Sequence, residues 1–516
     1  MASISDKATP TTEIDSQHHS QDGSNDEPRP VGWMYKSRKI GPITIPYYAS
    51  PKAQLILVAF VCFLCPGMFN ALNGLGGGGQ LDATAGNDSN TALYSTFSVV
   101  GFFAGTIVNT VGIKAALSFG GIGYCVYVSA YLCYNFTANL GYMIFSGALL
   151  GVCAGILWSA QGAIMMSYPT ESEKGRFISW FWMIFNLGGV IGSLVPLGQN
   201  INTTSNGTVS NGTYIGFLVL TTCGAILSTT LVNAKSVVRS DGSRVILMKH
   251  PSWKSELYGL YETLLSDPYI ILLFPMFFAS NWFYTYQFNG VNLAQFNVRT
   301  RSLNSVLYWS AQILGAWVFG NALDISKFKR TTRAKGAWVA LFALTMIIWG
   351  GGYAFQVNYT RDRVEAEAKL ESTDPSRKYF IDWEEGRYIG PMFLYIFYGF
   401  YDAAWQTSVY WYMGSISNNG RKLANFAGFY KGIQSAGAAI TWRIDALGVP
   451  YMHYFASCWA LLGGSLIIAL PVMLLKIHDT TPVEKDLEFT DETLADVVGE
   501  KPVGAMTTDV ERSGRD

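Results

Sequence analysis

The sequence predicts an all-α, polytopic membrane protein whose twelve transmembrane helices form two six-helix bundles. Only 14% of its 516 residues are charged and 50% are hydrophobic, with a mean hydropathy of +0.21, whereas a soluble globular protein averages about 25% charged residues. The 36 basic and 36 acidic residues cancel, so the chain lacks the basic excess with which proteins neutralise nucleic-acid phosphates. We therefore expect the lipid bilayer as the main partner and no nucleic acid.

Twelve apolar segments are long enough to span a hydrocarbon core of about 30 Å, which requires about 20 helical residues each. All seven cysteines lie inside these segments, so the sequence predicts neither a disulfide framework nor a metal site. The segments cover residues 53–74, 92–111, 115–135, 140–167, 176–198, 213–234, 268–289, 304–323, 334–357, 388–413, 422–445 and 452–476.

The segments divide the chain into two membrane-embedded halves between polar ends. Residues 1–50 are predicted to form a disordered tail that ends in a basic juxtamembrane stretch, because they hold too few apolar residues to fold alone. The first six-helix bundle is expected over 53–234 and the second over 268–476, joined by a connector at 235–267. The acidic end, 478–516, is predicted to be a second disordered tail.

The positions of lysine and arginine predict the orientation, because basic residues near span ends stay on the cytoplasmic side. Short loops on the side of the amino-terminal tail carry Lys114, Lys174 and Arg421, whereas loops 75–91 and 199–212 on the other side carry none. Both termini are therefore expected in the cytoplasm, at a plasma membrane or an endomembrane. Sequons on the opposite side predict glycosylation at Asn87, Asn202, Asn206, Asn211 and Asn358.

Two weak internal echoes favour an origin of the halves by duplication. In one, Gly175-Arg176 opens the fifth span and Gly420-Arg421 opens the eleventh. The other is a motif at the ends of the second and eighth spans. A glycine followed by Asn109 and Lys114 closes the second span, and a glycine followed by Asp324 and a basic run closes the eighth. With the six-plus-six plan, this motif resembles the gating motif of the major facilitator superfamily. The second-half copy keeps the acid, whereas Asn109 replaces it in the first half.

A closer resemblance lies in the first and fourth spans. Residues 65–80 (CPGMFNALNGLGGGGQ) and 158–162 (WSAQG) are similar to the fungal subgroup of the uncoordinated-93-like branch of that superfamily. The resemblance implies a facilitator fold without a settled substrate, since better-known relatives act as channel regulators or receptor-trafficking chaperones.

The first span carries a helix break and a glycine cluster. Pro66-Gly67 in mid-span predicts a kink or a partly unwound step. Asn70 and Asn73, three residues apart, are expected to share an inward face beyond that break, either as helix–helix hydrogen bonds or as cavity lining. The cluster at 74–79 lacks the lysine and preceding strand of a phosphate loop, which leaves close packing and a turn, or a mobile gate.

Neutral polar and aromatic side chains recur in several other spans. Each alone is compatible with helix packing, and together they predict a polar interior that binds a substrate. These candidates are Trp158, Gln161, Asn186, Tyr284, Gln287 and Gln312.

Two charges lie deep in the second half. Asp402 and Lys431 are both predicted roughly 14–16 Å from the cytoplasmic ends of their helices, at about 1.5 Å per residue. Either charge alone costs about 3 kcal/mol near the bilayer midplane, so we expect them to form a pair. Gln406 and Gln434 extend the same faces. The pair either takes part in substrate or proton binding or is a static salt bridge.

These features favour a transporter that moves a small polar solute or ion by alternating access. The rival is a non-transporting facilitator fold that regulates or escorts another membrane protein, such as an ion channel. Since no serine–histidine, paired-aspartate or metal constellation is present, the sequence predicts no enzyme activity and no cofactor.

Overall fold

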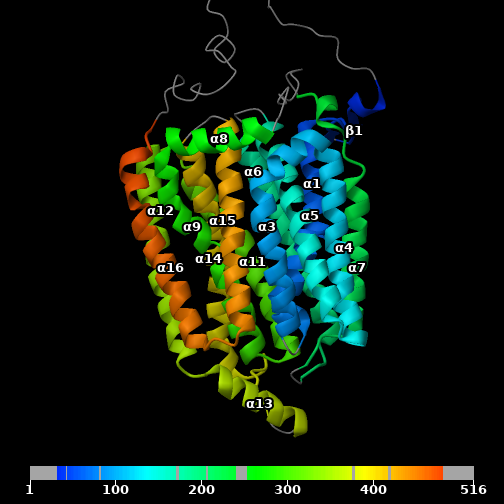
Figure 1. Ribbon diagram of the computed structural model, residues 1–516, viewed down its shortest axis with the longest axis vertical. Coiled ribbons are helices and arrows are strands. Elements are labelled where there is room, and N and C mark those ends of the chain that lie inside the picture. Colours follow the sequence, from blue (N-terminus) through cyan, green and yellow to red (C-terminus); the bar gives the residue numbers. More distant parts are fainter. Residues whose placement is uncertain are drawn as a thin grey trace, which may run out of the picture.

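The computed structural model describes residues 32–41, 43–80, 83–169, 174–204, 207–239, 253–374, 378–416 and 420–479. These residues are almost entirely helical, and the long helices run parallel to one another through the molecule (Figure 1). The first half contains α1 (Pro51–Leu64), α2 (Pro66–Gly74), α3 (Thr84–Val111), α4 (Ile113–Thr137), α5 (Leu140–Ser167), α6 (Lys174–Asn200) and α7 (Asn211–Ser228).

The second half repeats the plan with a more broken first span. That span joins the 3-10 helix η5 (Pro268–Leu273), α9 (Phe274–Ala279), α10 (Trp282–Thr285) and the π-helix η6 (Tyr286–Leu293). The remaining spans are α11 (Val298–Leu323), α12 (Arg330–Gln356), α14 (Ile389–Ile416), α15 (Gly420–Ala446) and α16 (Tyr451–Pro471), which continues into the π-helix η8 (Val472–Lys476).

The polarity of the helices reflects their positions in the fold. Seven helices within the described ranges are long and apolar enough to cross a membrane by themselves, whereas α3, α11, α14 and α15 are equally long but more polar. These four contribute side chains to a central cavity, as do α2, α5 and α6, and a helix that lines a polar interior does not need an apolar surface all round. The predicted all-helical, polytopic fold is therefore confirmed.

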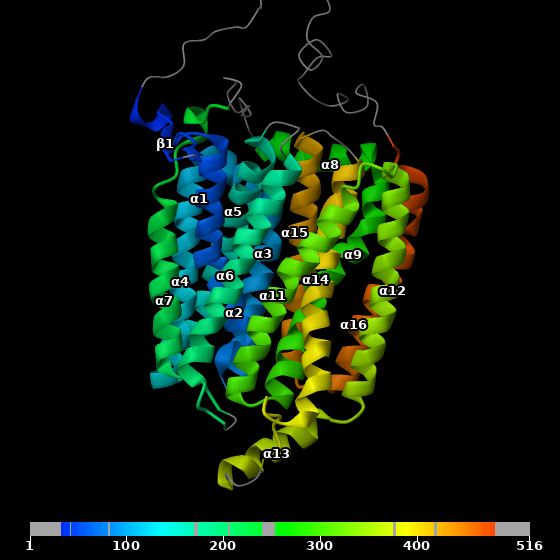
Figure 2. The ribbon, with the colours of Figure 1, turned by 180° about the vertical axis from the view of Figure 1, so that it is seen from behind.

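Buried apolar side chains form two main clusters, one per half. The first extends from Leu55 to Val237 and also includes Val298 of α11, and the second extends from Ile270 to Ile477. The halves meet where α3 packs on α15 and α6 packs on α11 (Figures 1 and 2). The Ser98 hydroxyl donates to the Gly432 carbonyl across the first contact (3.1 Å). Small residues at such crossings allow two helix backbones to approach closely.

The two ends of the bundles differ. One end carries the short strands β1 (Arg38–Ile40) and β2 (Ile43–Ile45) and the connector helix α8 (Trp253–Ser266), and we refer to it as the tail side (Figure 1). The other carries the helix α13 (Arg361–Thr373), and we refer to it as the α13 side.

The structure departs from the predicted disorder of residues 1–50. From residue 32 on, this segment is ordered: β1 and β2 pair in antiparallel register, and Gly41 in the turn has a φ of 61°, a left-handed conformation that glycine adopts readily. The Tyr35 and Tyr47 hydroxyls donate to the carbonyls of Ser236 and Val238. These partners after α7 hold a segment that composition alone assigns to a tail. Residues 1–31 and 480–516 lie outside the described ranges.

Candidate functional site

A cavity of about 780 Å³ lies between the two halves. Its wall includes the tail-side ends of several helices, with Met165 and Ile178 from the first half and Asp324 and Ser415 from the second. The cavity therefore extends from the middle of the molecule toward the tail side.

Hydrogen bonds between the halves close the α13 side. The Asn87 amide of α3 donates to Asp445 Oδ2 of α15 (2.8 Å), and Asn289 of η6 donates to both Asn87 Oδ1 and Asp445 Oδ2 (2.8 Å each). The Asn289 oxygen accepts the backbone N–H of Gly77 (2.7 Å). All three side chains are at most 3% exposed. We refer to Asn87, Asn289, Asp445 and Gly77 as the seal.

The glycine cluster after α2 forms a tight turn beside the seal. Gly76, Gly77, Gly78 and Gly79 all have φ values between 57° and 81°, which side chains other than glycine rarely adopt. The carbonyls of this turn accept hydrogen bonds from the fully buried Arg301 guanidinium of α11, which donates to Leu75 O (2.9 Å) and Gly76 O (3.4 Å).

An ion pair anchors the seal to α13. Arg361 Nη2 donates to Asp445 Oδ1 (2.5 Å), and the Arg361 Nε donates to the Val449 carbonyl (2.9 Å). Burial of the Arg361 guanidinium alone would lower its pKa, but the adjacent Asp445 carboxylate outweighs this effect and the pKa of Arg361 lies above its usual value. Asp445 is therefore held in place by three separate donors.

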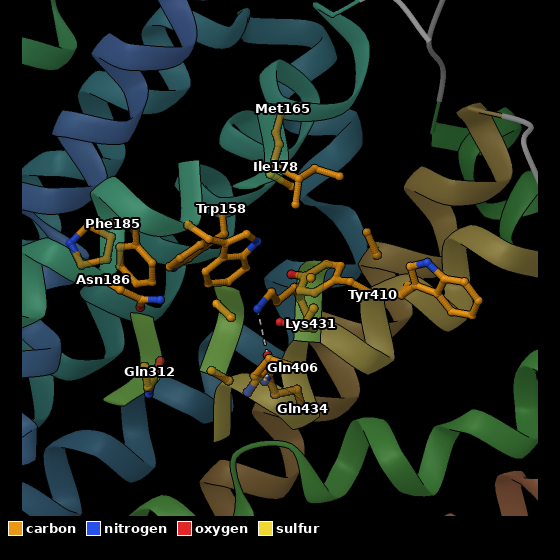
Figure 3. Close-up of a pocket in the computed structure, with 18 of the residues that line it drawn as sticks. Trp158, Met165, Ile178, Phe185, Asn186, Gln312, Gln406, Tyr410, Lys431 and Gln434 are labelled. Carbon is orange, nitrogen blue, oxygen red and sulfur yellow. Dashed lines mark hydrogen bonds between the residues drawn. The ribbon is translucent and has the colours of Figure 1, made fainter. Parts of the chain in front are cut away.

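Lys431 projects into the cavity from α15. Its ammonium donates to Gln434 Oε1 (3.0 Å) and lies 5.1–5.7 Å from the ring centroids of Trp158, Tyr410 and Tyr430. Figure 3 shows it between Trp158 and the pair Gln406–Gln434. Rings at this distance stabilise a cation through their electron-rich faces.

Asp402 occupies a different environment behind the cavity wall. Its carboxylate is fully buried and accepts hydrogen bonds from the Tyr284 hydroxyl (2.7 Å), the Tyr308 hydroxyl (3.2 Å) and the amides of Gln312 and Gln406. Four neutral donors thus compensate the charge. The ion pair predicted between Asp402 and Lys431 is absent from the described residues, whose ion pairs include neither side chain.

Most of the side chains that the sequence predicts to bind the substrate line the cavity. Four of them are not on its wall. Asn73 donates to Phe69 O and accepts from Asn90, Gln161 bonds Met165 Sδ, Gln287 accepts from Tyr308, and Asp402 is buried as described. Those on the wall are Asn70, Trp158, Asn186, Tyr284, Gln312, Gln406, Lys431 and Gln434.

The side chains of Asn70 and Asn73 have different surroundings, although their spacing predicts a common face. The first helix, α1, ends before Cys65, and α2 begins at Pro66, as the sequence predicts. A separation of three residues turns a helix by about 300°, which leaves an offset of about 60°. In α2 this offset places Asn70 on the cavity wall and Asn73 against α3.

The motif residues at the tail side are only partly described. Asp324 caps the end of α11, is exposed and lies on the cavity wall. Lys114 is half-buried in the first turn of α4, after the positive-φ residue Gly112 (φ 87°). Asn109 lies in α3, but its side chain is outside the described part of the structure.

The glycosylation prediction fails at Asn87. Its side chain is 2% exposed and its amide nitrogen is bonded to Asp445, so an N-linked glycan has no space there. Asn202, Asn211 and Asn358 are exposed on the α13 side and remain candidates. Asn206 lies outside the described residues.

Several residues of the site are missed by the sequence analysis. Many aromatic residues of the cavity wall, including Tyr94, Tyr124 and Trp182, are missed because aromatic residues are common in membrane helices. The role of Asn87 in the seal is missed because Asn87 matches a sequon. The contact of Arg301 with the glycine turn is missed because Arg301 lies in a polar stretch ahead of the eighth apolar segment. Within the described ranges, no group of three or more His, Cys, Asp or Glu side chains forms a metal site.

Two helical halves around a central cavity define a facilitator-type, multi-pass membrane protein. The fold matches the Escherichia coli fucose:proton symporter with a TM-score of 0.53 at 11% sequence identity, covering 83% of this chain and 98% of that chain. It also matches a D-xylose-proton symporter with a TM-score of 0.51 at 11% identity, covering 82% and 97%. At this identity the likeness shows the fold alone.

Sequence comparison identifies the family. Residues 77–447 match the family described as "Ion channel regulatory protein UNC-93". An UNC93-like protein of Schizosaccharomyces pombe is 53% identical over 449 residues, 87% of each chain, and UNC93-like protein 1 of Arabidopsis thaliana is 40% identical over 445 residues, 86% of this chain and 94% of the relative. The chain belongs to the UNC-93 family, an UNC93-like branch of the major facilitator superfamily.

Proposed function

We propose that this protein moves a small polar solute or ion across its membrane by alternating access, without catalytic chemistry. The observation that carries the proposal is the cavity between the halves, which reaches the tail side while the seal closes the α13 side. A route with one closed end is what rocking of two bundles around a midplane site requires. Its volume of about 780 Å³ lies in the usual range for small-molecule sites.

The orientation of the proposed route follows from the loops. Basic residues favour a cytoplasmic tail side with both termini in the cytoplasm, which makes the described conformation inward-facing. The candidate sequons Asn202, Asn211 and Asn358 agree, since the glycosylation machinery acts on the opposite side. A plasma membrane and an endomembrane both fit this arrangement.

Uptake into liposomes that contain the purified protein tests the proposal. Thr407 lines the cavity and is half-buried, so Thr407→Cys provides a handle inside the route. We expect solute flux from the Thr407→Cys protein, loss of that flux after alkylation with a bulky maleimide, and no effect of the maleimide on a protein that has Thr407.

The family description favours a second function, regulation of an ion channel or another membrane protein. In that case the cavity is not a route, and the protein acts through a bound partner. Affinity isolation from membranes separates the two functions. A stoichiometric membrane-protein partner, together with no flux for any solute tested, would support regulation and overturn the transport proposal.

A further inference from the structure

We propose that the substrate of the cavity is an organic anion whose charged group binds the Lys431 ammonium. This inference rests on the proposed transport function and deepens it by assigning a substrate class. It separates the roles of the two deep charges: Lys431 binds the substrate, and Asp402 positions the wall around it.

The first step is that Lys431 faces the cavity without an anionic group in ion-pair contact. Among the ion pairs that the described residues form, none includes Lys431. Among the described residues its hydrogen-bond acceptor is the neutral Gln434, and three aromatic rings surround the ammonium. The Asp402 carboxylate acts on Lys431 only through space. An ammonium in a low-dielectric site gains most from an anion that can reach it.

The second step is that Asp402 acts on Lys431 through space but makes no ion-pair contact with it. The carboxylate is 0% exposed and is not part of the cavity wall. Its four donors include Tyr284, Gln312 and Gln406, which do line the wall. Asp402 therefore fixes the orientation of neutral wall residues and leaves the charge of Lys431 available to the cavity.

The third step is the sign of the remaining charge. Among the described residues on the wall, the charged ones besides Lys431 are Asp324, Arg330 and Arg333, all at the tail-side end. Without Arg330, which has a partner of its own, the wall carries the two positive groups Lys431 and Arg333 and one negative group, Asp324. A cleft lined by one predominant sign concentrates ligands of the opposite sign.

The fourth step concerns the rest of the substrate. Beside Lys431 the wall is aromatic: Trp158 stacks on Trp182 with ring centroids 6.4 Å apart and meets Phe185 edge to face at 5.3 Å. The Asn186 oxygen next along α6 is buried and has no hydrogen-bond partner within the described residues. The chemistry therefore fits an amphipathic anion with a flat apolar body and a hydrogen-bond donor.

A charge-matched labelling experiment tests the inference. The reporter is Thr407→Cys with the three exposed or half-exposed cysteines, Cys125, Cys133 and Cys223, replaced by serine. Membranes with an accessible tail side are treated with anionic sulfonatoethyl methanethiosulfonate or with cationic trimethylammonioethyl methanethiosulfonate. The quantity measured is the ratio of the anionic to the cationic labelling rate.

We expect Lys431→Gln to lower this ratio by about fivefold or more, because a unit charge several ångströms away acts on the two reagents with opposite sign. Lys431→Arg, which keeps the charge, should preserve the ratio. Lys235→Gln is the control, since Lys235 is an exposed lysine outside the cavity wall and outside the motif at the tail side. Size-exclusion profiles and melting temperatures establish that each variant is folded.

The outcomes distinguish this inference from the transport proposal. An unchanged ratio in folded Lys431→Gln would overturn the anion site, as would liposome flux that favours a cation or a neutral solute over anions. Flux of a cation would leave transport standing and would mean that the substrate competes with Lys431 for the aromatic rings. An anion-favouring cavity with no flux for any solute would overturn transport and leave the anion site standing.

Discussion

Replacement of Asn87 by alanine is the most informative perturbation of the seal. The Asn87 side chain donates to Asp445 and accepts from Asn289, and both partners belong to the opposite half. In the proposed alternating access, these two hydrogen bonds are present while the α13 side is closed and break when it opens. Their loss should therefore favour a conformation that is open on the α13 side.

The structure sets the size of the effect. A hydrogen bond to a charged group contributes about 1.5–3 kcal/mol and a neutral one about 0.5–1.5 kcal/mol, so Asn87→Ala should weaken the seal by about 2–4 kcal/mol. Since about 1.4 kcal/mol corresponds to a factor of ten, the ratio of closed to open protein should fall by about 30-fold or more.

The assay measures access from the α13 side to Thr407→Cys in the cavity. A membrane-impermeant maleimide is applied to that side, and the labelling rate is followed with and without Asn87→Ala. Asn358→Ala is the matched control, because Asn358 is an exposed sequon asparagine whose amide bonds only nearby carbonyls, those of Ala354 and Phe355. We expect labelling about tenfold faster or more for Asn87→Ala and no change for Asn358→Ala.

Equal labelling rates in the parent protein and the Asn87→Ala variant would refute this reasoning. Such a result would mean that Asn87, Asn289 and Asp445 stabilise the fold without controlling access to the cavity.

Further predictions concern the deep charges and the glycine turn. Asp402→Asn should lower solute uptake about tenfold at normal surface expression, because the carboxylate orients residues of the cavity wall. Lower expression with normal uptake would instead show that Asp402 serves folding. Asp402 and Lys431 form no direct ion pair, but hydrogen bonds through Gln434 and Gln406 link them. The loss in the logarithm of the uptake rate for the double alanine variant should therefore differ from the sum of the two single losses, and a summed loss would show that the two residues act independently. Gly78→Ala should destabilise the fold by about 1–3 kcal/mol, because an added Cβ would lie 2.2 Å from Tyr131 Cε1. The control is Gly350→Ala, which has open space around the added Cβ and should leave the melting temperature of the purified protein unchanged. Equal melting temperatures for Gly78→Ala and Gly350→Ala would argue against a rigid glycine turn.

The sequence predicts the helical architecture well because long apolar segments have few alternatives in a bilayer. The break at Pro66 could also be predicted, since proline removes a backbone donor wherever it lies in a helix. The depth of Asp402 and Lys431 follows from counting residues along each helix. Their lack of contact does not, because depth leaves undetermined the direction in which a side chain projects from the helix axis.

The seal is hidden from sequence reasoning by its polarity. Helix α3 begins at Thr84 and α11 at Val298, each several residues before the apolar segment that predicts it. These polar first turns are stabilised by contacts with the other half, as at Asn87 and Arg301. A prediction of helix ends from hydrophobicity therefore leaves out the turns that such polar contacts stabilise.

A reversible cross-link between the two halves on the α13 side tests the proposed alternating access most directly. Arg443 and Asp88 form an ion pair between the halves on the α13 side (3.2 Å), and both have exposed side-chain surface. Cysteines at these two positions can be bridged by a short cross-linker that carries two methanethiosulfonate groups. Each group forms a disulfide with one cysteine, and reduction of these disulfides removes the bridge. We predict that bridging stops solute flux in liposomes and that reduction restores it. Undiminished flux through the bridged protein would contradict the alternating-access account.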